Sequence, residues 1–168
     1  MATDALEGLD RVVLDAMQLP HFRWLDLAAS VITVLGQGEV VGVVALGVTI
    51  VRLRARRRDW WVPLLFVVVL AIEIALKIVV PQAPPPRELV RNVRFAPFLE
   101  GFAPYAFPSG HVARTAFLVT ALRWPSALAV VAVVVMSLTR IYLGEHWPSD
   151  VLGGWLLGYG IARVARRA

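Results

Sequence analysis

The sequence has few charged residues, few histidines and no cysteine. Charged side chains make up 17% of the 168 residues and hydrophobic ones 58%, whereas a soluble domain usually carries about 25% and about 45–50%. This imbalance indicates an integral membrane protein. The lack of cysteine excludes disulfides and thiolate metal sites. The length fits one domain, and we expect residues 1–168 to form it.

Lysine is also nearly absent, because Lys77 is the single lysine among seventeen basic residues. The formal net charge of +5 could suggest a nucleic-acid partner. However, the basic residues cluster where membrane topology would place them, and no interleaved basic and aromatic strand pattern accompanies them. We therefore expect no nucleic-acid partner. The acidic, amphipathic N-terminus does not have the pattern of a cleavable signal peptide.

The hydrophobic runs predict an all-α fold, a polytopic membrane bundle of about five transmembrane helices. A span needs about 20 mostly apolar residues, and residues 25–51 and 60–80 provide that length. Three later runs are shorter, and each ends at a charged cluster. This favours spans that stop around a recessed polar site, although tilt or local thinning would also shorten a span. The shorter runs are residues 112–122, 125–139 and 151–164.

The segment before residue 25 predicts an amphipathic helix lying on the membrane surface. Its apolar residues recur near helical spacing, but they alternate with acids that would be too costly to bury in lipid as a sixth span. These acids are Asp4, Glu7, Asp10 and Asp15.

The distribution of arginine predicts the orientation of the bundle. The loop Arg52–Asp59 holds five arginines, which marks it as cytoplasmic. Five spans then place Arg123 and the arginine-rich C-terminus on that side, and residues 81–108 and 140–150 on the other. We therefore predict a multi-pass protein of the cell (inner) membrane with its polar site facing the extracytoplasmic side.

Two pairs of glycines are spaced four residues apart, which lets helices approach closely. The pairs are Gly38 with Gly42 and Gly154 with Gly158. We favour packing within one chain over a dimer interface, and the oligomeric state stays open.

Three polar clusters are expected at the outer end of the bundle. They are Lys77, the PSGH motif at residues 108–111, and the segment RIYLGEHWPSD at residues 140–150. One charge in the membrane costs about 2.5–3.5 kcal/mol. A set of charges at one depth is therefore better explained by a shared ligand.

The residue types in these clusters suit a tetrahedral oxyanion. Ser109 is a favourable N-cap, and the amides of Gly110 and His111 would then form a helix start that binds anions. His146 and Asp150 are four residues apart, so the carboxylate can orient the imidazole.

Two fixed cations complete the pattern, because Arg140 and Lys77 can neutralise phosphate oxygens. Two histidines, two cations and a helix N-terminus predict displacement at phosphorus. One histidine would attack, and the other would protonate the leaving oxygen.

The motif PSGH followed by Arg-x5-His-x3-Asp resembles the type 2 phosphatidic acid phosphatase family, whose site architecture is shared with vanadium haloperoxidases. The family pattern is KxxxxxxRP, then PSGH, then SRxxxxxHxxxD. The second motif is complete, and Thr139 replaces the serine of the third. In the first motif Lys77 is present, but Pro84 stands at the arginine position and Arg87 follows three residues later. The resemblance runs from about residue 25 to the C-terminus.

The resemblance implies a role for each matching residue. His146 would attack phosphorus and form a phosphohistidine, Asp150 would orient it, and His111 would protonate the leaving group and then activate water. No cofactor or metal is implied. The phosphate-binding groups would be Lys77, Arg140, Ser109, Gly110 and, from a shifted loop, Arg87.

Several neighbouring residues have open roles. If Arg87 does not reach the pocket, then Arg91, Arg94 or Arg114 could replace it, and we favour a place in the site for Arg114. Glu73 is expected to neutralise Lys77 or tune its charge. Glu145 is read as a solvated neighbour of His146, and His21 as structural.

The leading hypothesis is a metal-independent membrane phosphatase that hydrolyses a lipid phosphate or diphosphate. Undecaprenyl or another polyprenyl diphosphate is favoured, with phosphatidylglycerol phosphate and phosphatidic acid as alternatives, and membrane lipids surround the protein. A phosphotransferase with the same phosphohistidine is a second possibility. A third, of another class, is a transporter that holds a metal with His111, His146, Glu145 and Asp150.

Overall fold

The computed structural model describes residues 2–19, 21–93 and 105–167, and they form helices joined by loops and turns. This confirms the all-α prediction. The elements in chain order are α1 (Ala2–Gln18), α2 (Arg23–Val34), α3 (Gly38–Arg54), η1 (Val62–Leu65), α4 (Phe66–Val79), η2 (Arg87–Leu89), α5 (Gly110–Ala121), α6 (Ser126–Tyr142) and α7 (Pro148–Ala165).

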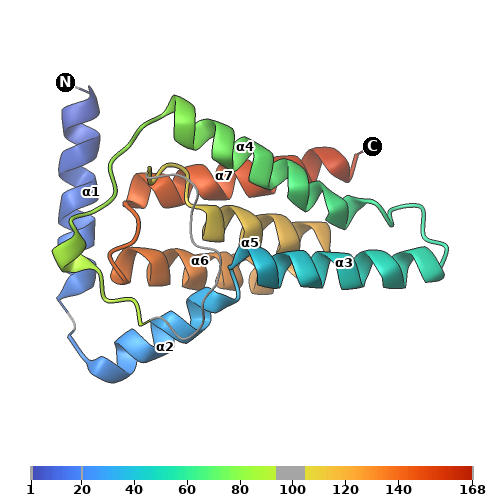
Figure 1. Cartoon of the computed structure of the whole chain (residues 1–168), viewed down its shortest axis with the longest axis horizontal. Helices are drawn as coiled ribbons and strands as arrows, with labels where there is room; N and C mark the ends of the chain where they lie inside the picture. The colour runs from blue at the N-terminus through green and yellow to red at the C-terminus, as the bar shows by residue number, and fades with distance from the viewer. Residues whose placement is uncertain (1, 20, 94–104, 168) are drawn as a thin grey trace.

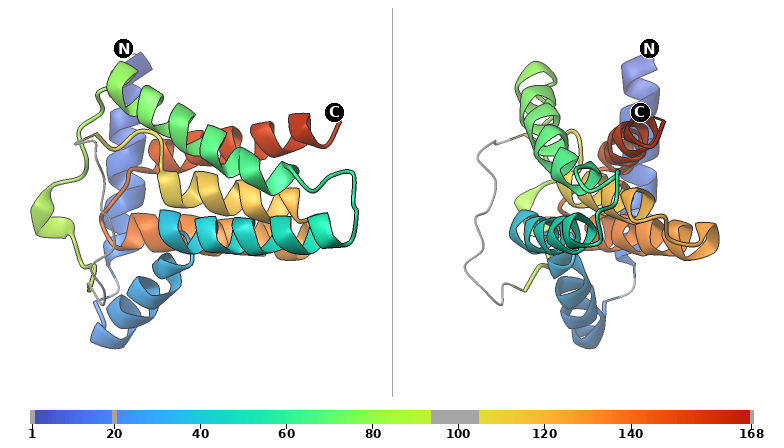
Figure 2. Two further views of the ribbon diagram at one scale, coloured as in Figure 1. Left: turned by 45° about the vertical axis from the view of Figure 1, so that its right-hand side comes forward. Right: turned by 90° about the vertical axis from the view of Figure 1, so that its right-hand side faces the viewer.

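Helices α3 to α7 run along a common direction, and α5 lies among them (Figures 1 and 2). It packs against α3, α4, α6 and α7, and its contact with α7 is the most extensive in the described structure. The α5 side chains that face its neighbours are small or apolar, and Val112, Ala113 and Phe117 are fully buried. The N-terminal ends of α5 and α7, which carry the polar motifs, therefore meet at one end of the bundle.

Two glycines of α7 make the close approach to α5 possible. A Cβ atom on Gly154 would meet the backbone carbonyl oxygen of Ser109, and a Cβ on Gly158 would meet that of Ala113. In the other pair, a Cβ on Gly42 would lie 3.3 Å from the ring of Phe66. The prediction that these spacings serve packing within one chain is confirmed for these positions.

Replacing Gly158 by alanine is expected to destabilise the protein by about 1–3 kcal/mol, because the added methyl group would overlap backbone that cannot rotate away. Gly160→Ala is the matched control in the same helix, since a Cβ there meets nothing within 4 Å. The measurement is the Tm of each purified variant in the same detergent. Equal Tm values for the two variants would contradict this account of the α5–α7 contact.

The prediction of one continuous span over residues 25–51 is wrong in one respect. This segment forms two helices, α2 and α3, with an angle of 42° between them. The break lies at Gly36, where a Cβ would come within 3.0 Å of both His111 and Met136. By length and composition, the run Val62–Val79 can cross a membrane, and α2 with α3 can do so if they count as one span. The number of spans stays a prediction.

The N-terminal helix α1 lies across the end of the bundle where α7 begins, transverse to α5 and α7 (Figure 1). Leu14 is fully buried against the bundle, while Leu6, Leu9 and Val12 are exposed. The amphipathic helix predicted before residue 25 is therefore present. Its orientation is the one expected for a helix in the plane of a membrane surface.

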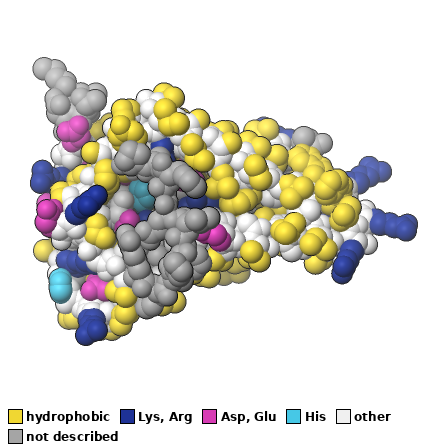
Figure 3. Space-filling model, viewed as in Figure 1, with side chains coloured by type: hydrophobic (Ala, Val, Ile, Leu, Met, Phe, Trp, Pro, Cys, Tyr) yellow, Lys and Arg dark blue, Asp and Glu magenta, His cyan; other side chains and the backbone are white. Residues whose placement is uncertain are grey.

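The side-chain types are unevenly distributed along the bundle. Figure 3 shows hydrophobic side chains over most of its length, basic side chains projecting from the end where α3 and α7 finish, and mixed charges at the opposite end. Many of the apolar side chains on α3, α4, α6 and α7 are exposed. An apolar belt between two polar ends is the surface expected of a membrane-embedded bundle.

Candidate active site

The two histidine motifs are joined directly through their backbones. Ser109, the N-cap of α5, donates its amide hydrogen to the carbonyl oxygen of Asp150 in the first turn of α7, with a distance of 2.9 Å. Both residues are fully buried. This hydrogen bond brings PSGH beside HWPSD, although 40 residues lie between the serine and the aspartate in the sequence. His111 and His146 consequently lie within electrostatic range of each other.

His146 is held by the carboxylate of Asp150. The Nδ1 atom of His146 lies 3.4 Å from Asp150 Oδ2, which also accepts the Trp147 amide at 2.9 Å. With the Nδ1 proton facing the carboxylate, the lone pair of Nε2 is available. Burial and the nearby Arg140 guanidinium hold the pKa of His146 well below its ordinary value, so the ring is neutral near pH 7.

Lys77 and Arg140 approach the histidines from α4 and α6. The Lys77 ammonium donates to the carbonyl oxygens of Tyr105 at 2.9 Å and Ala106 at 3.2 Å, just before the PSGH motif. Both cations lie within electrostatic range of His111 and His146. The cluster therefore surrounds the two imidazoles with positive charge.

Arg140 is buried and fixed by two partners that the sequence did not reveal. Its Nη1 atom donates to the hydroxyl of Thr33 at 2.8 Å, and its Nη2 atom lies 3.4 Å from Glu145 Oε2. Glu145 also accepts a hydrogen bond of 2.9 Å from Asn92. Glu145 is partly exposed and lies within electrostatic range of His146, as expected, and its direct contacts are with Arg140 and Asn92.

Arg114 joins the cluster from the second turn of α5. Its Nη2 atom lies 3.4 Å from Nδ1 of His111, its Nη1 atom lies 3.4 Å from Glu73, and its Nε donates to the carbonyl oxygen of Gly36 at 3.1 Å. Glu73 therefore forms its ion pair with Arg114, and it also lies within electrostatic range of Lys77. The bend at Gly36 supplies the carbonyl oxygen that orients the guanidinium.

The other arginines considered for this pocket are placed differently. Arg87 is exposed at the start of η2, and none of the contacts described above involves it. Arg91 donates to the carbonyl oxygen of Gln18 at 2.8 Å and lies over the ring of Tyr142. Arg94 lies outside the described residues. Among the described candidates, Arg114 is the one in contact with a motif histidine.

Two buried polar atoms of the PSGH motif have no hydrogen-bond partner among the described residues, namely Ser109 Oγ and His111 Nε2. Because a guanidinium only donates, the contact with Arg114 makes Nδ1 of His111 an acceptor and leaves the proton on Nε2. Gly110 adds a close approach here, since a Cβ on it would meet the carboxylate of Glu73. Buried polar groups without partners are costly, so these two atoms are available to hydrogen-bond with water or with a polar ligand.

Helix α1 supports the start of α7 through Asp10. The Asp10 carboxylate is buried and accepts hydrogen bonds from the amide of Ser149, at 2.9 Å, and from its hydroxyl, at 2.5 Å. The loop after α4 also contacts this turn, because Trp147 donates to the carbonyl oxygen of Ala83 at 2.8 Å. Asp10 was one of four acids in an amphipathic pattern, and nothing in the sequence separated it from the other three.

Replacing Asp10 by alanine is expected to lower kcat about threefold to tenfold and to leave KM within about twofold. The two lost hydrogen bonds loosen the turn that carries His146 and Asp150, at a cost of about 0.5–1.5 kcal/mol each. The control is Asp15→Ala, because Asp15 is an exposed acid on the same helix. The measurement is steady-state phosphate release from the substrate proposed below. Equal kcat values for the two variants would exclude a positioning role for Asp10.

The sequence from residue 60 to residue 168 matches the PAP2 superfamily, and the chain belongs to this family. The complete PSGH motif and the Arg-x5-His-x3-Asp motif both lie within the matched region. The family indicated by these motifs is therefore confirmed.

Two curated relatives extend this comparison. An undecaprenyl-diphosphatase of Sulfolobus acidocaldarius is 40% identical over 63 residues, which are 34% of this chain and 31% of that protein. Phosphatidylglycerophosphatase B of Bacillus subtilis is 29% identical over 177 aligned positions, which cover 93% of this chain and 81% of that protein. The chain thus spans less than a third of the first relative and most of the second.

A solved structure agrees with the fold. The crystal structure of a transmembrane PAP2 type phosphatidylglycerolphosphate phosphatase from Bacillus subtilis superposes with a TM-score of 0.78. The match covers 97% of this chain and 85% of that one, at 24% sequence identity. The polytopic membrane bundle predicted from the hydrophobic runs is the fold of this family.

Proposed function

We propose that this protein is a membrane phosphatase that removes phosphate from a lipid phosphate or diphosphate through a phosphohistidine. The observation that carries the proposal is the hydrogen bond from the Ser109 amide to the Asp150 carbonyl oxygen, which brings the two histidine motifs together. Lys77, Arg140 and Arg114 add positive charge around them. This arrangement is suited to a phosphoryl group that gains charge in the transition state.

In the first step, Nε2 of His146 attacks phosphorus, and the bond from phosphorus to the leaving oxygen breaks as the bond to nitrogen forms. Asp150 stabilises the positive ring through Nδ1, and His111 gives a proton to the leaving oxygen. In the second step, water attacks phosphorus and transfers a proton to His111. The bond to nitrogen then breaks and regenerates neutral His146.

To act as the proton donor, His111 must first carry a hydrogen on each of its two ring nitrogens. Nδ1 can hold a hydrogen only if Arg114 does not donate to it. In the described arrangement Arg114 donates toward Nδ1, so that nitrogen cannot also hold a proton. Arg114 therefore turns from His111 to a phosphate oxygen when the substrate binds, and Nδ1 takes up a proton. On this account Arg114 fills the place of the arginine that Pro84 replaces in the first motif.

The proposed substrate is undecaprenyl or another polyprenyl diphosphate, with phosphatidylglycerol phosphate as the next candidate. The names of the Sulfolobus and Bacillus relatives support these two classes. The site lies at the bundle end opposite the arginine-rich end (Figures 1 and 3). By the positive-inside rule this end faces the extracytoplasmic side of the cell membrane, where a polyprenyl carrier is released and needs recycling.

The phosphotransferase alternative uses the same phosphohistidine with a lipid or sugar hydroxyl in place of water. The transporter alternative needs Glu145 as a metal ligand, but the Glu145 carboxylate pairs with Arg140 and Asn92. This weakens the transporter alternative. We therefore expect the site to work without a metal ion.

The test is phosphate release by the purified protein in detergent, from polyprenyl diphosphate, phosphatidylglycerol phosphate and phosphatidic acid in parallel. We expect turnover that is insensitive to a chelator and blocked by vanadate, a tetrahedral mimic of phosphate, with the highest kcat/KM for polyprenyl diphosphate. Turnover abolished by the chelator and unaffected by vanadate would reject the proposed mechanism. Transfer to an added alcohol in preference to water would favour the phosphotransferase.

A further inference from the structure

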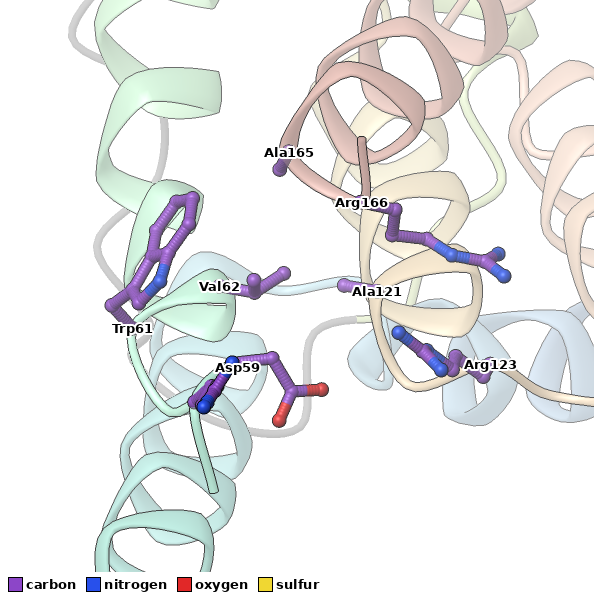
Figure 4. A pocket seen from close by; sticks show the side chains of 8 residues that line it. Asp59, Trp61, Val62, Ala121, Arg123, Ala165 and Arg166 are labelled. Atoms are coloured by element: carbon purple, nitrogen blue, oxygen red, sulfur yellow. The ribbon is translucent and has the colours of Figure 1, made fainter. Parts of the chain in front are cut away.

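A second concentration of positive charge lies at the other end of the bundle, around a small hollow. Its lining comes from the loop before η1, the turn after α5 and the end of α7. Figure 4 shows Arg123 and Arg166 on one side of the hollow, and Trp61 and Asp59 on the other. The full lining is Arg58, Asp59, Trp61, Val62, Ala121, Arg123, Ala165 and Arg166.

The single acid in this lining is already neutralised by arginines outside it. Asp59 accepts hydrogen bonds of 2.9 and 3.2 Å from Arg57, and it lies 3.5 Å from the buried Arg52. Among the described residues, Arg58, Arg123 and Arg166 form no ion pair of their own. The hollow therefore carries uncompensated positive charge from three separate segments of the chain.

The size and floor of the hollow indicate what it can hold. Its volume is about 130 Å³, which is enough for a phosphate group and too little for a whole lipid. Val62, Ala121 and Ala165 are buried around it. Next to it, Leu64, Val67 and Val164 are exposed on η1, α4 and α7.

An anion that enters this hollow would have an apolar surface immediately beside it. Elements η1, α4 and α7 contact one another. Exposed aliphatic side chains stand close to the lining along the chain, because Leu64 follows Val62 by two residues and Val164 directly precedes Ala165. A free phosphate would use the charge alone. A phospholipid would use both the charge and the apolar surface, with its phosphate among the arginines and its acyl chains against exposed side chains such as Leu64 and Val164.

We propose that the hollow lined by Arg58, Arg123 and Arg166 binds the phosphate headgroup of an anionic phospholipid from the leaflet at that end of the protein. The bound lipid would connect the last turns of α5 and α7 to the loop before η1. At their other ends, α5 carries His111 and α7 begins two residues after His146. The lipid is therefore a structural ligand, distinct from the substrate.

The test compares lipid retention by native mass spectrometry of the full-length protein, taken from neutral detergent with added phosphatidylglycerol or phosphatidylcholine. The wild type should retain one phosphatidylglycerol in preference to phosphatidylcholine. The double variant R123Q/R166Q should bind phosphatidylglycerol roughly 25-fold more weakly, at about fivefold for each arginine near a charged headgroup. The matched control is R54Q/R163Q, which removes two exposed arginines at the same end outside the hollow, and it should stay within about threefold.

Three outcomes would overturn this proposal. The first is equal retention of the two lipids by the wild type, and the second is an equal loss of phosphatidylglycerol binding in the two double variants. The third is that inorganic phosphate in lipid-free detergent raises the Tm of the wild type but not that of R123Q/R166Q. The last would identify a site for free phosphate. Lipid retention is measured without enzyme turnover, so the two proposals are tested independently. A failure to retain phosphatidylglycerol would not contradict the phosphatase proposal, and a lack of phosphatase activity would not contradict the lipid site.

Discussion

Replacing His146 by alanine is expected to lower phosphate release by roughly 10³-fold or more, because in the proposed mechanism His146 forms the bond to phosphorus. His146 combines a neutral ring, a carboxylate at Nδ1 and surrounding cations. His111 cannot replace it, because in the proposed mechanism both of its ring nitrogens carry hydrogens when the substrate is bound. The measurement is kcat on the preferred lipid, together with mass spectrometry of the protein during turnover to detect bound phosphate.

The matched control for this prediction is His21→Ala, because His21 is exposed and lies in the connection between α1 and α2. We expect activity within about twofold of the wild type. A second variant, His146→Gln, keeps a polar side chain beside Asp150 and guards against a loss of fold, which the Tm of each variant will report. If a folded His146 variant kept a tenth of the wild-type activity, the nucleophile would have to be assigned elsewhere.

Replacing Arg114 by glutamine is expected to lower kcat/KM about 10- to 100-fold, with part of the loss in KM. A charge-assisted hydrogen bond to phosphate is worth about 1.5–3 kcal/mol, and Arg114 is the partly buried cation in contact with His111. The matched variant Arg87→Gln removes the arginine that the sequence placed nearest to the first motif. We expect it to stay within about threefold, because Arg87 is exposed.

The Arg114 variant needs its own control for folding, since its loss leaves the buried Glu73 carboxylate without its ion pair. An uncompensated buried charge can cost about 3–5 kcal/mol. The double variant Glu73→Gln with Arg114→Gln removes both charges and should restore the Tm while kcat/KM stays low. Recovery of activity together with the Tm would show that Arg114 acts only on stability.

Much of the bundle was predictable because its signals are local. The helices α4 to α7 lie where the apolar runs placed them, since a membrane-embedded chain must satisfy its backbone hydrogen bonds within each helix. The PSGH and HWPSD motifs were also predictable, because the chemistry of phosphoryl transfer restricts the residue types. The break between α2 and α3 was not, since an apolar run containing Gly36 reads as one span.

The sequence by itself determined the class of fold, the family and the candidate residues for a site that acts on phosphorus, since these depend on residue type and short-range spacing. Only the tertiary structure decided which partners those residues have. The Ser109–Asp150 hydrogen bond and the support of Ser149 by Asp10 join segments that are far apart in the sequence. Arg114 and His111 are neighbours on one helix, but the orientation of Arg114 depends on the Gly36 carbonyl oxygen of another segment. No local pattern encodes such contacts, because they form only when helices from distant parts of the chain pack together.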